Sequence, residues 1–327
     1  MLDAAPSISS FHVVILIPLR DDWAPAVELI RRLDQAIAPN SYVVDILLVD
    51  DGSIQDYRAV DFPSRFQTLR SIRILRLRRN LGHQRAIAVG LVHIEREIPC
   101  DAVLVMDGDG EDTPEGTLQL LHAFSGKTAV FAKRSRRTES ITFRVFYRLY
   151  KIFHFCLTGV RVQVGNFSIL PSAYLRTLVV MPELWNHYAA AVFRSRLPFT
   201  AIPIPRGHRI AGESKMNFVS LIVHGMSAIS VFGDVVGVRL LVASLAGTAM
   251  ALLGIVAVIC IRAFTILAIP GWATYAAGAL AIILIQFIAM ASVFTFTILS
   301  DRTSLSFLPL RDCGMLVEGV KDIYRND

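Results

Sequence analysis

The sequence predicts an α/β domain built on a mainly parallel sheet, followed by two helices that cross a membrane. Short β-branched segments alternate with segments of helical periodicity over residues 1–135, which is the pattern of βαβ units. Two later stretches, 240–261 and 263–300, contain no charged residue. Each is long enough to supply the roughly 20 apolar residues that cross a bilayer. They help to explain why 54% of all residues are hydrophobic. A pair of buried core helices is the alternative interpretation.

The individual segments support the α/β prediction. Strands are expected within residues 12–18, 43–53, 72–77, 101–110, 128–134 and 199–206. Apolar residues between Ala26 and Ile37 recur on one helical face, and residues 84–97 also read as a helix. Pro114 suits the first turn of a further helix.

Charged side chains follow the strands at the points where such sheets bind ligands. In open α/β sheets the binding crevice lies beyond the carboxyl ends of the strands. The residues at these positions are Asp21, Asp22, Asp50, Asp51, Asp107, Asp109, Lys133 and Arg134. A single acidic turn is common, but several turns that meet at one edge of a sheet indicate a functional site.

Asp107 and Asp109 form an Asp-x-Asp element, and Glu111 follows closely. Mg²⁺ and Mn²⁺ prefer carboxylate and phosphate oxygens. Two carboxylates on a tight turn can therefore hold such an ion against a diphosphate and neutralise the charge of a leaving nucleotide diphosphate. An acidic turn without a metal is the alternative.

Three segments in a fixed order resemble a known family: VDDGS at 49–53, RNLGHQRAIAVGL at 79–91 and VMDGDGEDTPE at 105–115. They resemble the family-2 glycosyltransferases of the GT-A fold. The branch typified by dolichol-phosphate mannose synthase and the bacterial polyprenyl-phosphate glucosyltransferases is the most similar. VGNFSIL at 164–170 and GESK at 212–215 continue the resemblance, as do the two C-terminal spans.

The resemblance implies roles for the residues that match these motifs. Pro18 and Asp21 would line the base pocket, although PLRDD stands where the family has P-x-Y-N-E. Asp50 or Asp51 would contact the nucleoside, with turn capping as the alternative for Asp51. Asp107 would lie near the ribose and the metal, Asp109 would be the main metal ligand, and Glu111 would add charge there.

A basic segment implies an acceptor site in the same way. In the family, a cationic group after the fifth strand binds the phosphate of the lipid acceptor, and we expect Arg134, Arg137 and Arg144 to do so here. Ser214 and Lys215 resemble part of a family loop that closes on the diphosphate and the acceptor, and the resemblance implies the same role here. A solvated basic loop and a plain turn are the respective alternatives.

The implied reaction is inverting transfer of a sugar from a nucleotide-diphosphate donor to a polyprenyl phosphate. A phosphate monoester is already anionic near pH 7, because its second pKa is about 6, and it needs no general base. A glycolipid or polysaccharide hydroxyl acceptor would need one, and Glu183 is the nearest candidate. A non-catalytic membrane protein that retains the fold is the third interpretation.

The predicted membrane topology places the catalytic domain in the cytoplasm. Arg239, Arg302 and Arg311 flank the outer ends of the two spans, whereas the turn between them carries only Arg262. The apolar run at 13–17 is too short for a signal peptide. The expected organisation is a GT-A domain at 1–215, an interfacial amphipathic helix at 216–238 (with a buried helix as the alternative), a hairpin at 239–300 with spans 240–261 and 273–299, and a cytoplasmic tail at 301–327.

These expectations define the partners of the chain. It would be a multi-pass protein of the inner membrane that binds a nucleotide sugar, Mg²⁺ or Mn²⁺, and a polyprenyl phosphate lipid. The net charge of +6 suits anionic lipid. No nucleic-acid-binding motif accompanies it, and a homo-oligomer is compatible with the sequence.

Overall fold

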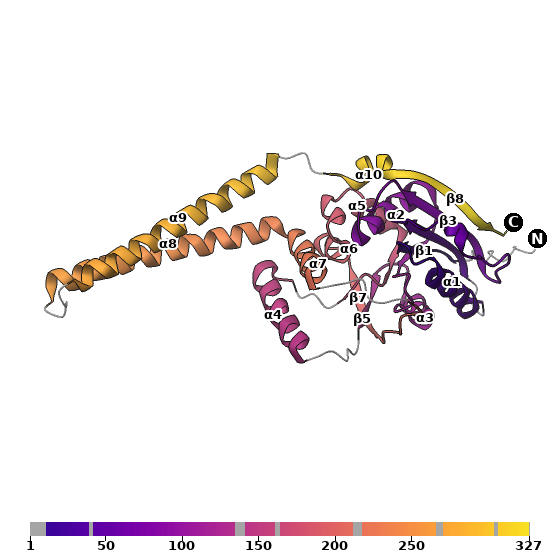
Figure 1. The fold of residues 1–327 in the computed structure, drawn as a ribbon, viewed down its shortest axis with the longest axis horizontal. Coiled ribbons are helices and arrows are strands. Elements are labelled where there is room, and N and C mark those ends of the chain that lie inside the picture. Colours follow the sequence, from indigo (N-terminus) through magenta and orange to yellow (C-terminus); the bar gives the residue numbers. More distant parts are fainter. Residues whose placement is uncertain are drawn as a thin grey trace, which may run out of the picture. The chain divides into compact units, whose positions relative to one another are not determined.

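The computed structural model describes residues 11–38, 42–134, 141–160, 164–211, 218–265, 271–303 and 307–326. These residues belong to two compact units (Figure 1). The first unit comprises Met1–Tyr147, Val162–Val231 and Phe307–Asp327, and the second comprises Arg148–Arg161 and Phe232–Ser306. The chain therefore passes twice from the first unit into the second and back.

The first unit is organised by one sheet, which has eight strands among the described residues. The strands are β1 (Phe11–Leu19), β2 (Tyr42–Asp50), β3 (Leu69–Leu77), β4 (Ala102–Val105), β5 (Ala129–Arg134), β6 (Ser168–Pro171), β7 (Phe199–Ile204) and β8 (Val317–Arg325). Their order is β7-β5-β6-β4-β1-β2-β3-β8. Strands β6 and β8 pair antiparallel with their neighbours and the remaining pairings are parallel. Each strand expected from the sequence is present.

Helices cover both faces of the sheet, because the central strands are apolar on both sides. In β1, Val14 and Leu16 belong to one core, while Val13, Ile15 and Ile17 belong to the other. Figure 1 shows α1 and α3 on the face opposite α2, α5 and α10. The helices of the first unit are α1 (Trp23–Ile37), α2 (His83–Glu97), α3 (Pro114–Ala123), α5 (Leu175–Leu178), α6 (Tyr188–Arg194), α7 (Phe218–Ser230) and α10 (Pro309–Asp312). Short 3₁₀ turns occupy Tyr57–Ala59, Ser172–Tyr174, Pro182–Trp185 and Cys313–Leu316.

The C-terminal segment forms strand β8, which the sequence analysis did not predict. Residues 301–327 were expected to be a tail, whereas Val317–Arg325 pair antiparallel with β3 and lie along it in Figure 1. Strand β8 forms because it covers what would otherwise be the exposed edge of the sheet at β3. Without β8, the N–H and C=O groups on the outer side of β3 would lack strand partners.

The second unit is dominated by two long helices, α8 (Gly233–Phe264) and α9 (Trp272–Thr303), which lie side by side (Figure 1). Both are long and apolar enough to cross a membrane, and the expected spans 240–261 and 273–299 lie within them. Little of either apolar window is buried inside the protein. Glycines allow close packing of the pair: a Cβ at Gly247 would lie 2.5 Å from the Phe287 ring.

The segment expected as one interfacial helix, 216–238, is divided between two helices. Helix α7 ends at Ser230, and α8 begins at Gly233. Another helix, α4 (Ile141–Thr158), carries exposed apolar side chains at Leu149, Ile152 and Phe153. Its C-terminal end is joined to α8 because the Arg239 guanidinium donates to the Cys156 carbonyl at 2.8 Å. The exposed apolar surface therefore extends from the long helices to α4.

Candidate active site

One edge of the sheet collects the polar residues. The parallel strands β1, β2, β3, β4, β5 and β7 end there. The antiparallel strands β6 and β8 begin at the same edge. Residues just after the parallel strands and just before the antiparallel ones therefore meet, which is where ligands bind in sheets of this kind.

Asp21 joins the ends of β1 and β2. Its backbone has φ 55°, and its Oδ1 accepts from the backbone N–H groups of Ile54 at 2.7 Å and Gln55 at 3.0 Å. Its own N–H donates to the Ser53 hydroxyl at 2.9 Å. Asp21 thus orders the loop after β2. Pro18, the other expected base-pocket residue, is buried within β1.

Asp50 and Asp51 are adjacent but have different surroundings. Asp50 is 3% exposed, and its Oδ1 accepts from the Ser53 N–H at 2.8 Å. The Asp51 carboxylate instead accepts from the backbone N–H groups of Leu81 at 2.6 Å and Gly82 at 2.8 Å. Burial raises the pKa of Asp51, and the two backbone hydrogen bonds only partly offset this effect. Asp51 therefore fixes the start of α2.

The acidic turn after β4 is shaped by its own side chains. Asp112 is buried and accepts from the Asp107 N–H at 2.9 Å, while Asp109 accepts from the Glu111 N–H at 2.9 Å. Gly110 has φ 84°, a conformation that favours glycine. Helix α3 starts directly afterwards, capped by the Thr113 hydroxyl. The turn is thus held rigidly where β4 ends.

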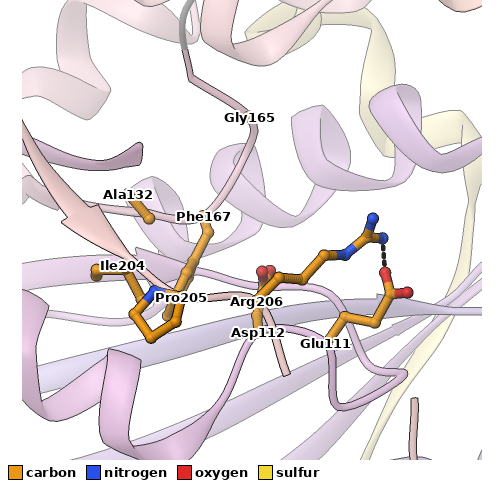
Figure 2. A pocket seen from close by; sticks show the side chains of 8 residues that line it. All are labelled: Glu111, Asp112, Ala132, Gly165, Phe167, Ile204, Pro205 and Arg206. Atoms are coloured by element: carbon orange, nitrogen blue, oxygen red, sulfur yellow. Dashed lines mark ion pairs between the residues drawn. The ribbon is translucent and has the colours of Figure 1, made fainter. Parts of the chain in front are cut away.

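A basic loop after β7 packs against this turn. The N–H groups of Gly207 and Ile210 donate to the carbonyls of Glu111 and Asp109, each at 2.9 Å. Arg209 pairs with Asp109 at 2.7 Å, and Arg206 pairs with Glu111 (Figure 2).

Burial lowers the pKa of Arg206, although the carboxylates of Asp109 and Asp107 act in the opposite direction. Both Arg206 and Glu111 line a small hollow, together with Asp112, Ala132, Gly165, Phe167, Ile204 and Pro205 (Figure 2).

A polar network connects the acidic turn to α2 and β6. His83 Nε2 lies 3.1 Å from Asp107 Oδ1 and 3.2 Å from Asn166 Nδ2. Gln84 donates to Asn166 and accepts from the Tyr188 N–H at 2.8 Å. Burial opposes protonation of His83, but the charges of Asp107, Asp112 and Asp109 outweigh it and raise the His83 pKa. His83 was not among the residues predicted for the site.

The comparisons agree with this geometry. The profile described as "Glycosyl transferase family 2" matches residues 14–177, which is half of the chain and runs from β1 to α5. The chain belongs to glycosyltransferase family 2. The predicted GT-A-like fold is confirmed, and the matched region includes the acidic turn and the loops that hold Asp21, Asp50 and Asp51.

Two curated relatives of this family-2 glycosyltransferase are informative. The uncharacterized glycosyltransferase YkcC of Bacillus subtilis (strain 168) is 25% identical over 275 residues, which are 80% of each chain. The undecaprenyl-phosphate 4-deoxy-4-formamido-L-arabinose transferase of Salmonella choleraesuis (strain SC-B67) is 28% identical over 68% of this chain and 67% of its own. Among solved structures, mannosyl-3-phosphoglycerate synthase from Rubrobacter xylanophilus is 14% identical, with TM-score 0.45 over 68% of this chain and 72% of its own.

The acidic turn was expected to bind a metal through Asp107, Asp109 and Glu111. Among the described residues, no group of three or more His, Cys, Asp or Glu side chains is gathered as a complete metal site. Each expected ligand is instead close to a basic side chain: Asp107 to His83, Asp109 to Arg209, and Glu111 to Arg206. The donor set still fits Mg²⁺ or Mn²⁺, because such ions are commonly held by one or two carboxylates plus substrate phosphates.

The roles of several predicted site residues are not tested by the described part of the chain. Arg137, Ser214 and Lys215 lie outside the described residues, and the side chains of Arg134 and Arg144 are likewise not described. Glu183, the candidate base for a hydroxyl acceptor, pairs with Arg194 at 3.2 Å. Their roles therefore stay predictions.

Proposed function

We propose that this family-2 glycosyltransferase moves a sugar, with inversion, from a nucleotide-diphosphate donor to a polyprenyl phosphate at the cytoplasmic face of the inner membrane. Family membership and the activity for which the Salmonella relative is named support this function. One structural observation carries the proposal: an acidic turn and an arginine loop meet at the carboxyl edge of the sheet.

The acidic turn and the arginine loop together have the charge pattern of a donor site. A diphosphate brings negative charge that Arg206 and Arg209 can bind. A divalent ion held by Asp107 and Asp109 would neutralise the charge of the departing nucleotide diphosphate. Donor binding would thus exchange pairs within the protein for pairs with the ligand. Pro18, Asp21 and Asp50 would lie towards the nucleoside.

The acceptor chemistry favours a phosphate over a hydroxyl. A lipid phosphate reaches the anomeric carbon already ionised. A sugar hydroxyl would need a base, and the candidate Glu183 is held by Arg194 at 3.2 Å. Arg134, Arg137, Arg144 and Lys215 are proposed to hold the acceptor phosphate, with Ser214 beside the diphosphate.

The membrane assignment is supported by α8 and α9 and by the exposed apolar residues of α4. Strands β1 and β8, which precede and follow the two long helices in the chain, belong to one sheet. Helices that cross a membrane between these strands must therefore leave and return on the same side. The distribution of Arg239, Arg262, Arg302 and Arg311 indicates that this side is the cytoplasm.

The decisive experiment supplies the purified full-length chain with undecaprenyl phosphate, Mg²⁺ or Mn²⁺, and a series of labelled nucleotide sugars. We expect one donor to give a lipid-linked product, with loss of metal-dependent turnover in Asp109→Asn. Glu115→Gln is the matched control, because Glu115 is exposed at the start of α3. Transfer to a soluble sugar, with none to the lipid, would reject the acceptor. A large loss of rate in Glu183→Gln would then favour a hydroxyl acceptor.

A further inference from the structure

Strand β8 begins at the proposed donor edge of the sheet. The Arg78 N–H donates to the Leu316 carbonyl at 2.9 Å, and Leu77 is paired with Val317. Because β8 runs antiparallel to β3, its first residues lie beside the last residues of β3. The segment that follows the second long helix therefore reaches the edge that carries Asp50.

Arg76, near the end of β3, lies between two carboxylates. Its Nε is 3.2 Å from Oε2 of Glu318, at the start of β8, and 3.8 Å from Oδ2 of Asp50. The other oxygen of Asp50 accepts from the Ser53 N–H. The closer partner of the guanidinium is thus Glu318, although Asp50 is almost completely buried and Glu318 is 51% exposed.

We propose that Glu318 is a positioning residue for the donor: it holds Arg76 away from Asp50, so that the Asp50 carboxylate can accept from the nucleoside. The proposal rests on the proposed function, in which Asp50 faces the donor. Glu318 acts through Arg76 and does not itself touch the ligand.

Glu318 and Asp50 compete for a single cation, the Arg76 guanidinium. Without Glu318, the guanidinium keeps one carboxylate partner within reach, and its 3.8 Å distance from Asp50 Oδ2 can shorten to that of a direct hydrogen bond. The attraction between opposite charges increases as they approach, more strongly beside a buried group than in water. A direct Arg76–Asp50 pair would occupy the oxygen that the nucleoside needs, and donor binding would first have to break that pair.

A structural role for Glu318 makes a different prediction. Charged residues on an edge strand discourage pairing with other chains, and exposed ion pairs contribute little to stability. If Glu318 did only this, its loss would leave the donor KM unchanged. The donor KM and the nucleotide Kd therefore distinguish the two roles.

The experiment uses the full-length chain in detergent and the variants Glu318→Ala, Arg76→Ala and Arg76→Ala/Glu318→Ala. Binding of UDP, GDP and CDP is measured by calorimetry, and the nucleotide with the lowest wild-type Kd is used for the variants. Asp322→Ala is the matched control, because Asp322 is an exposed acid on the same strand, paired in register with Arg73.

We expect Glu318→Ala to raise the nucleotide Kd and the donor KM about fivefold, the change that corresponds to one partly exposed ion pair. We expect kcat to change less than twofold and Asp322→Ala to behave as wild type. The double variant should bind more tightly than Glu318→Ala, because no guanidinium remains to cover Asp50. An unchanged Kd in Glu318→Ala, or a double variant no better than the single one, would overturn the positioning role.

Failure of the proposed function gives a different result. If the wild-type chain binds none of the three nucleotides, both proposals are overturned. If the wild type binds and Asp50→Ala weakens binding while Glu318→Ala does not, only the role of Glu318 is rejected.

Discussion

Replacing Asp51 by alanine separates support of the site from contact with the donor. Asp51 is buried, and its carboxylate accepts the N–H groups of Leu81 and Gly82 at the start of α2. Asp50, its neighbour, is the proposed nucleoside contact. We therefore expect Asp51→Ala to lower the stability of the fold, and Asp50→Ala to weaken nucleotide binding.

The magnitude follows from the hydrogen bonds that are lost. In Asp51→Ala the buried Leu81 N–H loses the acceptor 2.6 Å away, which costs about 1–3 kcal/mol. The Gly82 N–H is less affected, because it also donates to the Asn80 side chain at 3.0 Å. Burial raises the pKa of Asp51, so ionisation of the native carboxylate carries a cost that alanine removes. The expected loss is about 2 kcal/mol, or an unfolding midpoint lower by about 4–8 °C.

Thermal unfolding of the full-length protein, followed by tryptophan fluorescence, measures this change. Asp51→Asn is the control, because its amide oxygen can still accept from Leu81, and we expect it to lose less than half as much. Nucleotide Kd is measured at low temperature, where all variants are folded, and should rise more in Asp50→Ala than in Asp51→Ala. A midpoint unchanged in Asp51→Ala, together with a large loss of nucleotide affinity, would show that Asp51 contacts the donor.

Three further predictions concern the same unit. Burial raises the pKa of Asp45, but hydrogen bonds from His12, Arg70 and Ser71 outweigh it and hold that pKa below its usual range. The stability that Asp45 contributes is therefore complete at neutral pH and is lost as the pH falls below about 4. The thermal unfolding midpoint of Asp45→Asn should then be lower than that of the wild type at pH 7, and the difference between the two midpoints should shrink in acid. Gly52 has φ 67°, and an added Cβ would lie 2.7 Å from the backbone nitrogen of Asn80. Gly126 has φ 79°, but an added Cβ there would meet open space. Gly52→Ala should cost more than Gly126→Ala, which carries only the strain of about 1–2 kcal/mol; equal midpoints would contradict the close approach. In the absence of nucleotide, Arg209→Ala should bind Mn²⁺ about three- to tenfold more tightly than the wild type, because one competing ion pair is removed. Electron paramagnetic resonance measures the Mn²⁺ affinity. An unchanged affinity would show that Arg209 and the metal do not share Asp109.

The sheet was predictable because its signals are local. A run such as Val13–Ile17 is apolar at every position, which is characteristic of a strand buried on both faces. The acidic residues then followed from the rule that ligands bind at the carboxyl ends of such strands. Strand β4 ends sooner than its apolar pattern and turn indicated, at Val105. Beyond Val105, the Asp107 N–H donates to the Asp112 side chain in place of a neighbouring strand.

The rest of the site depends on pairings between distant residues. Asn166 and Glu318 reach the edge because β6 and β8 run antiparallel to the other strands. The sequence of a short strand does not show whether it pairs parallel or antiparallel. The site contacts of His83 could not be predicted, because its partners, Asp107 and Asn166, belong to other elements. A pattern along the chain cannot show contacts of this kind.

The order of elements along the chain couples the membrane hairpin to the donor edge. Strand β8 can pair with β3 only after the chain has passed through α8 and α9, so the outer edge of β3 stays uncovered until the two long helices have been made. If those helices cross the membrane, completion of the sheet requires both crossings and a return to the starting side. The first residues of the returning strand include Glu318, which lies 3.2 Å from Arg76. A chain that fails to return would therefore leave a strand edge open and lack the partner that holds Arg76 away from Asp50, so donor binding would depend on correct insertion.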